Sequence, residues 1–357
     1  MRAPNAILPW AAIERTAFAA PGDDLFASWL WFDLLARAAR PPGRVPAGLM
    51  TEGAILPLWC RPRAGALQPA EGMTSPYSIA FRLAPNNPTA RAAALTAALA
   101  AALVRTVRGV VRLDALDPAD PAIAAFERAA AETGLATHRF SHFSNWFMPV
   151  EGDFAHWLAT RPGALRNTIK RRMKAAASLQ FCSFGWITSP PNHQPITLDD
   201  AIAGFAAVYA GSWKPPEPFA QINEQIMRSL AGAGVLRVGL LADQTGPLAA
   251  QYWAVSGQRA FLLKLAYLKS AANHSPGTVL TALMIQSLLA TDPIAYLDFG
   301  RGDDPYKRDW VSRQQHRIGL LLINRRSAQG VAMLARLRLA ALRRAYRPPT
   351  SSVSPAP

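Results

Sequence analysis

The chain has few cysteines and no long hydrophobic segment, and both features narrow what it can be. Its two cysteines, Cys60 and Cys182, are far apart and form no CxxC pair. This argues against a disulfide framework or a cysteine-based zinc site, and it suits a reducing, cytoplasmic compartment. The longest apolar run covers residues 92–104, which is shorter than the roughly 20 residues of a membrane span. Only a short apolar run precedes Glu14, so we expect no signal peptide.

Acidic side chains are also scarce, and two segments have none. The chain carries 38 Lys and Arg against 23 Asp and Glu, a net charge of +15. Residues 161–174 hold six basic residues and residues 325–347 hold seven arginines, with no acid in either segment. The excess charge is therefore local, and it suits phosphate groups, anionic lipid or nucleic acid. Nucleic acid is the least expected partner, because no DNA- or RNA-reading motif is present.

What the sequence has in abundance is apolar residues, which make up 50% of it and allow a sizeable core.

The second half shows the clearest element order. Five strands are predicted there, at residues 235–242, 247–255, 259–268, 293–300 and 317–324. The first three are separated by short turns, which predicts an antiparallel meander. A helix should follow the meander, with Ser275 as its N-cap and Pro276 as its first residue.

The first half repeats this order in outline. Strands are predicted at 52–60, 76–83, 109–116 and 135–150, with helices at 89–107 and 119–134. Two helices, 162–178 and 198–213, connect the halves. The repetition suggests an old duplication. We therefore expect a first unit over residues 1–150, a second over 151–325, a basic helix over 326–347 and a disordered tail over 348–357.

The element order from 235 to 324 resembles the GNAT (Gcn5-related N-acetyltransferase) fold. The sequence details are similar to its CelD/BcsL-type branch, which was first linked to bacterial cellulose and exopolysaccharide biosynthesis. The resemblance is carried by residues 263–267, 275–277 and 298–310, and more loosely by 165–175 and 209–213. This branch also resembles the FemAB-type peptidoglycan aminoacyltransferases, whose two GNAT-like units in tandem agree with the internal repetition.

The resemblance implies an α/β (α+β) acyltransferase that moves an acetyl or other acyl group from acyl-CoA to an amine or hydroxyl. The acceptor would be a small molecule or a glycan, in cell-surface polysaccharide biosynthesis. One departure is visible. Typical GNAT enzymes carry a (Q/R)xxGx(G/A) loop before the helix that binds the coenzyme A pyrophosphate, whereas residues 271–277 contain one glycine. A FemAB-like aminoacyl-tRNA donor, or a non-catalytic binding protein of a polysaccharide-assembly system, therefore stays open.

A dense polar cluster follows the apolar strand at 293–300, and it predicts a site. Ligands bind at the carboxyl ends of the strands in a βαβ unit, and a free helix N-terminus attracts anions. Acyl transfer needs a base, oxyanion donors and an acid. Catalytic roles are predicted for Asp298, Asp303 and Tyr306. Donor binding is predicted for Lys264, Tyr267, Ser275, Gly277, Thr278 and Lys307. Acceptor binding is predicted for Arg166, Lys170, Trp213 and Arg301.

Structural explanations compete with several of these roles. Asp298 suits an Asx turn, Asp303 suits a helix start, and the cations of the 162–178 helix suit a solvated face. His138 and His142 lack acidic neighbours in the sequence, so we expect no metal site. At the C-terminal end, Val331, Leu334, Leu337 and Leu342 form an apolar side of a basic helix. This helix either packs on the domain or docks at the inner membrane as a peripheral contact.

Overall fold

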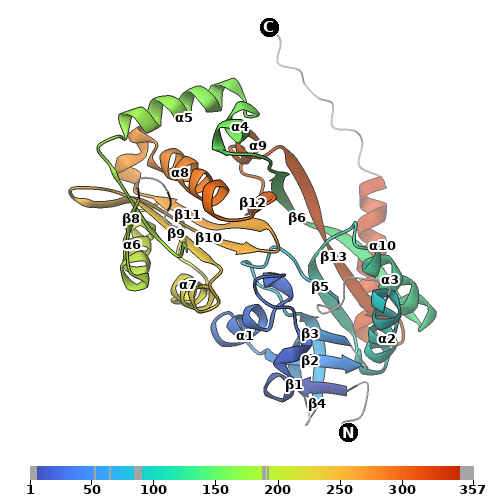
Figure 1. Ribbon diagram of the computed structural model, residues 1–357. Coiled ribbons are helices and arrows are strands. Elements are labelled where there is room, and N and C mark those ends of the chain that lie inside the picture. The colour runs from blue at the N-terminus through green and yellow to red at the C-terminus, as the bar shows by residue number, and fades with distance from the viewer. Residues whose placement is uncertain are drawn as a thin grey trace.

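The structure is a computed structural model that describes residues 6–51, 54–63, 66–83, 91–186, 190 and 193–345. Thirteen strands in this part of the chain join one mixed sheet (Figure 1). The strands are β1 Ala6–Pro9, β2 Val45–Thr51, β3 Ala54–Arg63, β4 Ala66–Gly72, β5 Val110–Leu116, β6 Leu135–Pro149, β7 Gln180–Phe184, β8 Gln194–Pro195, β9 Leu236–Asp243, β10 Gly246–Ser256, β11 Arg259–Tyr267, β12 Tyr296–Arg301 and β13 Arg313–Asn324. The helices are α1 Trp29–Ala38, α2 Arg91–Thr106, α3 Pro121–Glu132, α4 Phe154–Ala159, α5 Gly163–Ala175, α6 Leu198–Ala210, α7 Ile222–Gly232, α8 Pro276–Thr291, α9 Lys307–Trp310 and α10 Ala328–Ala345.

The same element order occurs twice along the chain. Three strands, a helix, a strand, a helix and a last strand follow one another from β2 to β6 and again from β9 to β13. The predicted repetition is therefore present in the fold. The meander of β9, β10 and β11 is antiparallel, as predicted, and β11 runs parallel to β12 after the crossover through α8.

The two repeats exchange their last strands. Strand β13 pairs with β5 of the first repeat, and β6 pairs with β12 of the second. In the sheet, β13 and β6 lie side by side between β5 and β12. Neither repeat therefore completes its sheet with its own strands alone. The boundary at residue 150 stays a prediction.

Helices cover both faces of the second-half sheet. Helix α8 packs on β9, β10 and β11 from one side, and α4 and α5 lie over α8 (Figure 1). Helix α8 is apolar around most of its surface, because it lies between these helices and the sheet. Helix α6 packs on the other face of the same strands, and α7 lies beside α6 and α1. The core on this second face is continuous with the core of the first half.

The entry to α8 differs from the prediction in one detail. The helix begins at Pro276, as expected, after a 3₁₀ turn over Lys269–His274. Ser275 has a left-handed backbone (φ 53°) and its side chain makes no cap hydrogen bond. A capping side chain requires an extended backbone at that position. The prediction that Ser275 caps α8 is therefore wrong.

The first half contains the largest errors of the predicted secondary structure. Residues 76–83 form a loop, not a strand, and the third strand of the first repeat is β4. A turn explains this difference, because the Ser78 N–H donates to the Ser75 carbonyl (3.0 Å) and the Ser75 N–H donates to the Ser78 hydroxyl (3.2 Å). Strands β1 and β2 and helix α1 were not predicted. The expected start of the 89–107 helix and the tail 348–357 lie outside the described residues.

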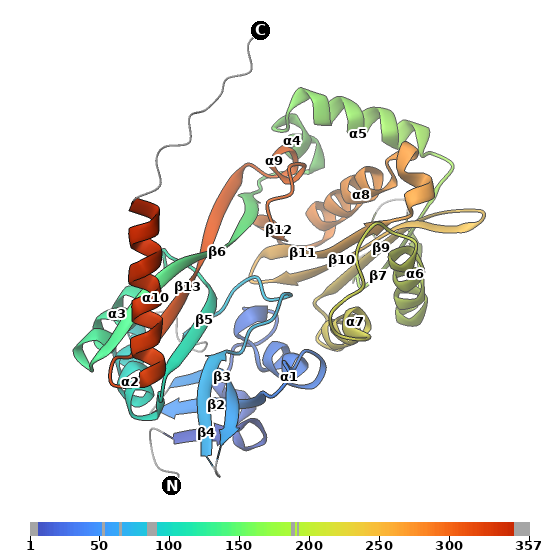
Figure 2. The same ribbon diagram turned by 180° about the vertical axis from the view of Figure 1, so that it is seen from behind.

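Helix α10 projects from the edge of the molecule beside β13 and β5 (Figure 2). Leu334 and Leu337 are half-buried, but Val331 and Leu342 are more than half exposed. The predicted apolar side therefore does not pack as one unit, because the helix contacts the sheet through only part of it. In the part of the chain that the structure describes, no helix is long and apolar enough to cross a membrane.

Candidate active site

Strands β11 and β12 separate, and a cavity opens where they part. Their parallel pairing covers three residue pairs, from Arg259 opposite Tyr296 to Phe261 opposite Asp298. Beyond Phe261, β11 continues to Tyr267 without pairing to β12. A cavity of about 510 Å³ lies against this part of β11 and is lined also by Phe299 and Arg301 of β12. The backbone edge of β11 is therefore exposed to the cavity.

A β-bulge lies in the same stretch of β11. Tyr252 of β10 pairs with Lys264, while the next residue, Trp253, pairs with Leu262. Leu263 is thus the extra residue of the bulge, and residues 262–264 all line the cavity. Bulges bend a strand and leave a residue out of the ladder, which is useful beside an active site. The backbone N–H groups of Leu263 and Lys264 in this bulge are therefore candidates for the oxyanion donors, beside those around Tyr267.

One wall of the cavity faces α8. Tyr267 packs against the start of that helix, where a Cβ added to Gly277 would meet the Tyr267 ring at 3.0 Å. The Trp213 ring lies 4.2 Å from the Tyr267 ring. Trp213, Tyr267, Gly277 and Thr278 all line the cavity, so four predicted residues are brought together here. Ser275 is not part of the lining, and the Thr278 N–H already donates to the Ser275 carbonyl (3.0 Å).

The opposite wall contains a hydrogen-bonded cluster around Glu217. The Tyr77 hydroxyl donates to Glu217 Oε2 (2.7 Å), and the Tyr209 hydroxyl donates to Oε1 (2.6 Å). The Lys264 ammonium forms an ion pair with Oε1. Burial opposes ionisation of Glu217, but the three donors outweigh it and lower the pKa of Glu217 below its usual value. Three donors occupy three of about four lone-pair positions of a carboxylate, so one position near Oε2 is left for a ligand.

Glu217 and Tyr77, and also Lys214 and Asp304 of the cavity lining, are site residues that the sequence analysis missed. Lys264 was predicted as a site residue because a lysine in an apolar strand requires a partner, and that requirement was the available signal. Glu217 is the only acid between Asp200 and Glu224, which makes it a natural candidate for the partner. Tyr77 lies 140 residues away from Glu217 in the sequence, and nothing local to the sequence connects the two.

Asp298 does not reach the cavity. Its side chain is 1% exposed, accepts from the Asn145 amide and the Gly300 N–H, and pairs with Arg259 at 3.1 Å. Burial raises the pKa of Asp298 above its usual value, although Arg259 opposes the rise. This position favours the Asx turn over the predicted role of catalytic base. Its backbone partner, Gly300, has φ 65°, a left-handed conformation that suits a glycine.

Asp303 also points away from the cavity. It accepts from the Trp146 indole (2.9 Å) and from the Gln314 amide (2.8 Å) on the outer side of the loop. Its neighbour Asp304 lines the cavity instead, together with Tyr306 and Lys307. The role of catalytic base predicted for Asp303 is therefore not supported by its position, because a base must reach the acceptor.

Tyr306 and Lys307 complete the cavity wall beside β12. The buried Lys307 ammonium donates to the Arg301 carbonyl (2.7 Å) and pairs with Asp304 (3.2 Å). Burial lowers the pKa of Lys307, and Asp304 partly restores it. Burial, together with the nearby Asp304 carboxylate, raises the pKa of Tyr306 well above its usual value. Tyr306 therefore stays protonated at neutral pH and can donate a hydrogen bond.

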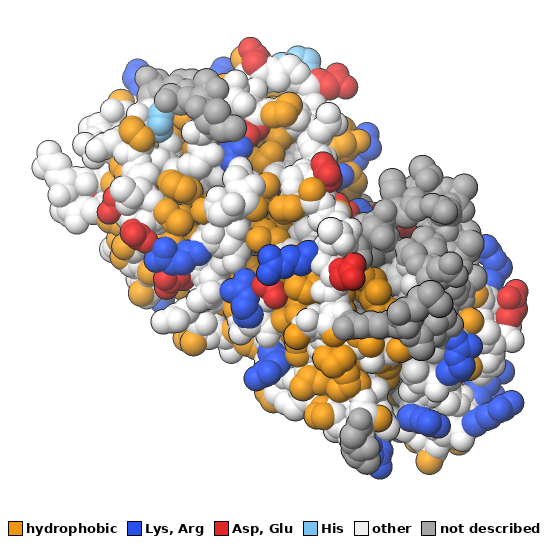
Figure 3. Space-filling model, turned by 60° about the horizontal axis from the view of Figure 1, so that its bottom comes forward, with side chains coloured by type: hydrophobic (Ala, Val, Ile, Leu, Met, Phe, Trp, Pro, Cys, Tyr) orange, Lys and Arg blue, Asp and Glu red, His pale blue; other side chains and the backbone are white. Residues whose placement is uncertain are grey.

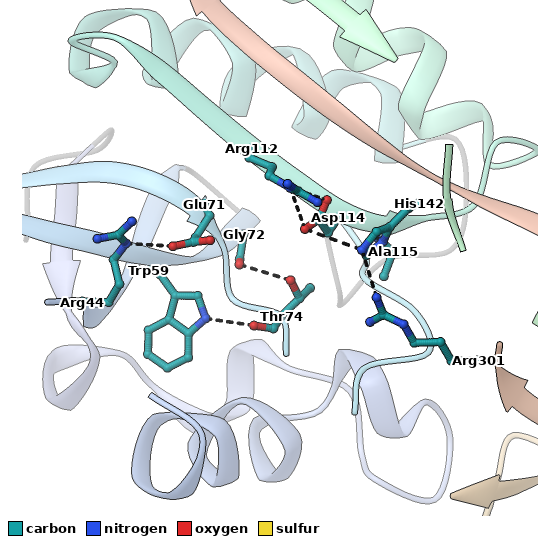
Figure 4. Close-up of polar contacts among 10 residues, drawn as sticks. All are labelled: Arg44, Trp59, Glu71, Gly72, Thr74, Arg112, Asp114, Ala115, His142 and Arg301. Atoms are coloured by element: carbon teal, nitrogen blue, oxygen red, sulfur yellow. Dashed lines mark hydrogen bonds and ion pairs between the residues drawn. The ribbon is translucent and has the colours of Figure 1, made fainter. Parts of the chain in front are cut away.

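Arg301 connects the cavity to the first half. Its guanidinium lies 4.4 Å from the centre of the Phe143 ring, and its Nη2 is 3.3 Å from His142 Nε2 (Figure 4). His142 Nδ1 accepts the Ala115 N–H (3.0 Å), which leaves Nε2 as the position for its proton. Burial lowers the pKa of His142. The Asp114 charge raises this pKa, but the positive charges of Arg301 and Arg112 lower it further. Arg301 is thus held beside β5 and β6.

Arg166 and Lys170 lie on α5, outside the cavity lining. Arg166 donates to the Ala159 carbonyl (2.9 Å), and Lys170 is exposed. The structure does not bring either residue to the cavity, which favours a solvated face for this helix. Within the described ranges, His, Cys, Asp and Glu side chains form no group of three that could hold a metal ion.

The corresponding opening in the first half is filled by the chain itself. Strands β4 and β5 pair at one position, Glu71 opposite Arg112. Residues 73–83 occupy the space beyond it: the Phe81 N–H donates to the Ala115 carbonyl (3.0 Å), and the Phe81 ring would lie 3.1 Å from a Cβ on Gly72. The Trp59 indole holds the start of this segment through the Thr74 carbonyl (Figure 4). The same segment then contributes Pro76, Tyr77 and Ile79 to the second-half cavity.

Comparisons with known proteins agree with this geometry. Residues 163–308 match the model of the acetyltransferase (GNAT) domain. The crystal structure of FemX is similar in fold, with a TM-score of 0.58 at 10% identity, covering 92% of this chain and 99% of that one. No curated protein sequence matches the chain. The prediction of a mixed α/β, GNAT-like fold is confirmed.

Two further structures match less closely. One is the C-terminal domain (DUF2156) of a putative lysylphosphatidylglycerol synthetase from Agrobacterium fabrum, with a TM-score of 0.48 at 11% identity, covering 91% of this chain and 94% of that one. The other is a tandem GNAT protein from the clavulanic acid biosynthesis pathway, with a TM-score of 0.44 at 13% identity, covering 89% and 98%.

Proposed function

We propose that this chain, whose residues 163–308 match the model of the acetyltransferase (GNAT) domain, is an enzyme that transfers an acyl group from acyl-CoA to an amine or hydroxyl acceptor. One observation carries the proposal: β11 and β12 part beside the N-terminal end of α8, and a cavity lies between them. An extended ligand that contains amide groups can pair with an unpaired strand edge in the way an added strand does. The edge of β11 beyond Phe261 offers such a surface.

The donor lies on the α8 side of this opening. Tyr267 and Leu265 face the start of α8, where an added Cβ on Gly277 would meet both side chains. The helix N-terminus favours the negative charge of phosphate groups. The Trp213 and Tyr267 rings form an apolar platform at the same end. These residues suit the long arm and the phosphates of an acyl-CoA.

The reaction is an attack of the acceptor nitrogen or oxygen on the thioester carbonyl. A backbone N–H of the β11 bulge, around Leu263, stabilises the oxyanion of the tetrahedral intermediate. The carbon–sulfur bond then breaks, and Tyr306 gives a hydrogen bond or a proton to the departing thiolate. The remaining lone pair at Glu217 Oε2 accepts the hydrogen bond of the attacking group, whose proton passes to solvent. The products are the acylated acceptor and the free thiol of CoA.

Binding measurements on the full chain test the donor. Free CoA and acetyl-CoA should stabilise the protein by about 2.7 kcal/mol at a hundredfold excess over Kd, and ATP, which lacks the thiol-bearing arm, should stabilise it much less. Absence of any effect from CoA, acetyl-CoA and longer acyl-CoAs would contradict the proposal. Stabilisation by an aminoacyl-tRNA alone would instead indicate the FemAB-like donor.

We further propose that the enzyme belongs to the CelD/BcsL-type branch and acts on a glycan or small acceptor of cell-surface polysaccharide biosynthesis. The cluster at residues 298–310 supports this, because it is the most specific part of the resemblance. A cavity closed by both halves of the chain also leaves room for an acceptor beside the donor. Acylation of a defined polysaccharide precursor by the purified enzyme, detected by mass spectrometry, tests this assignment.

Helix α10 is proposed to hold the protein at an anionic membrane surface. Val331, Leu339 and Leu342 are 54–56% exposed and fall within one side of the helix at 3.6 residues per turn. Arg338 and Arg343 flank this apolar strip and are exposed, and no acid lies in the helix. An exposed apolar strip with flanking cations is typical of a peripheral membrane helix.

Nucleic acid is a poorer partner for the charge of this protein. On the face drawn in Figure 3, Lys and Arg side chains lie in small groups between hydrophobic and acidic side chains, without one continuous basic surface.

Sedimentation with anionic vesicles at low salt tests the proposal that α10 binds a membrane. Leu339→Glu should lose sedimentation, whereas Ala340→Glu, with the same charge change on the other side of α10, should keep most of it. Equal behaviour of the two variants would contradict the proposal.

A further inference from the structure

Four positively charged and two negatively charged residues line the cavity, so its ion pairs leave some of the cations unpaired. The charged residues of its wall are Lys214, Glu217, Lys264, Arg301, Asp304 and Lys307. Lys264 pairs with Glu217, and Lys307 pairs with Asp304. Among the described residues, no carboxylate lies within 4.0 Å of the Lys214 ammonium or the Arg301 guanidinium. Neither of these two cations therefore forms an ion pair among the described residues, although Asp304 and Glu217 lie near enough to act on Lys214, and Asp114 on Arg301.

Both free cations are held by aromatic rings and partly removed from solvent. The Lys214 ammonium lies 5.5 Å from the centre of the Trp213 ring, and the Arg301 guanidinium lies 4.4 Å from the centre of the Phe143 ring. Each residue is half-buried. Burial lowers the pKa of Lys214, and the neighbouring Lys264 charge adds to this effect, while the Asp304 and Glu217 carboxylates oppose it. A charge in such a place is stabilised most effectively by an anion.

The two cations lie at different distances along the cavity from the donor wall. Side chains alternate between the two faces of a strand, so Lys264 faces away from the side on which Leu265 and Tyr267 meet α8. Lys264 contacts Glu217, which lies three residues after Lys214. Arg301 lies beside His142 and Phe143 of β6. Arg301 thus belongs to the wall that the first half forms, and Lys214 lies between the Trp213 ring of the donor wall and the Glu217 cluster.

We propose that the acceptor carries an anionic group, a phosphate or a carboxylate, which Lys214 and Arg301 bind. The reacting amine or hydroxyl of the same molecule then points toward Glu217. This inference rests on the proposed function and specifies its acceptor class. The phosphates of CoA have the same chemistry, so the test must distinguish an anion bound with the donor from an anion bound in its place.

Inorganic phosphate is the probe, and thermal unfolding of the full chain is the readout. Phosphate is compared with chloride at constant ionic strength, with and without saturating CoA. We expect phosphate to raise the Tm of the wild type, and to raise it by a similar amount when CoA is bound. Lys214→Gln and Arg301→Gln should each lose most of the rise. Arg128→Gln, an exposed arginine on α3, should keep it.

Three results would overturn the inference. They are a phosphate effect no larger than that of chloride, an effect that saturating CoA abolishes, or an equal loss in Arg128→Gln. Lys214→Gln keeps the test decisive if Arg301→Gln does not fold, because Lys214 lies in a surface-accessible loop after α6. A phosphate effect without any CoA effect would overturn the proposed donor and leave the anion site in place.

Discussion

Replacement of Glu217 by glutamine should destabilise the protein and weaken the cavity wall that both halves share. The Glu217 side chain is 13% exposed and its partner Lys264 is 19% exposed, so the pair is largely shielded from water. Glu217→Gln leaves the Lys264 ammonium without a counter-charge and keeps only one acceptor oxygen for the two tyrosine hydroxyls. Breaking a buried pair costs about 3–5 kcal/mol, and a hydrogen bond to a charged group contributes about 1.5–3 kcal/mol.

The expected loss in the free energy of unfolding is about 3 kcal/mol. This is the lower end of the range for a buried pair, because the pair keeps some contact with solvent. At an average unfolding entropy of about 2.1 cal/mol/K per residue, a chain of this length should lose about 4 °C in Tm. The matched control is Glu224→Gln. Glu224 pairs with Arg228 at the surface of α7, with side chains 36% and 46% exposed, so its loss should be below about 0.5 kcal/mol.

The pH dependence of stability distinguishes the contribution of the Glu217 charge from that of the shape of its side chain. The pKa of Glu217 is lowered from 4.5 in the folded state, so its contribution is present above pH 4.5 and is lost as the pH falls below that value. The Tm difference between wild type and Glu217→Gln should be constant from about pH 8 to about pH 5.5 and should shrink in more acidic solution. Lys264→Met in the Glu217→Gln background should restore part of the lost stability, because it removes the unpaired ammonium.

Differential scanning calorimetry measures all of these quantities. A loss for Glu217→Gln no larger than that for Glu224→Gln would refute the reasoning. So would a difference that stays unchanged below pH 4.5, because the carboxylate charge would then have no part in it.

Three further predictions concern the donor site. Gly277→Ala places a Cβ 3.0 Å from the Tyr267 ring, and such overpacking costs about 1–3 kcal/mol. CoA affinity, measured by titration calorimetry, should therefore fall about tenfold. An unchanged Kd would show that the Tyr267 ring moves aside freely. Tyr306→Phe should lower kcat without a change in Tm. Because the pKa of Tyr306 is raised from 10.0, the activity of the wild type should show no loss of this acid below pH 10.0. Full activity of the variant would exclude Tyr306 as the acid for the leaving thiolate. Titration with CoA should give one site per chain, because residues 73–83 fill the first-half opening; two sites would contradict that explanation.

The sequence by itself determined the elements of the second repeat, from β9 to β13. Each strand of the β9–β11 meander is an apolar run that ends at a local turn, such as Ser256–Gln258, and α8 starts at a proline. These signals act over a few residues, so they survive without tertiary information. The polar segment after β12 was predicted to form part of a site, and its residues Tyr306 and Lys307 line the cavity.

The tertiary structure decided which polar residues face the cavity. Asp298 and Asp303 have the same residue type as Asp304 and lie within six residues of it, but the first turns into the buried sheet and the second turns outward to Trp146 and Gln314. The strand exchange of β6 and β13, and the filling of the first-half opening by Phe81, are likewise invisible in local patterns. The Glu217 cluster joins residues 47 and 140 positions apart. Only folding brings such distant groups together, since their contact depends on how both halves pack across one sheet and not on any spacing along the chain.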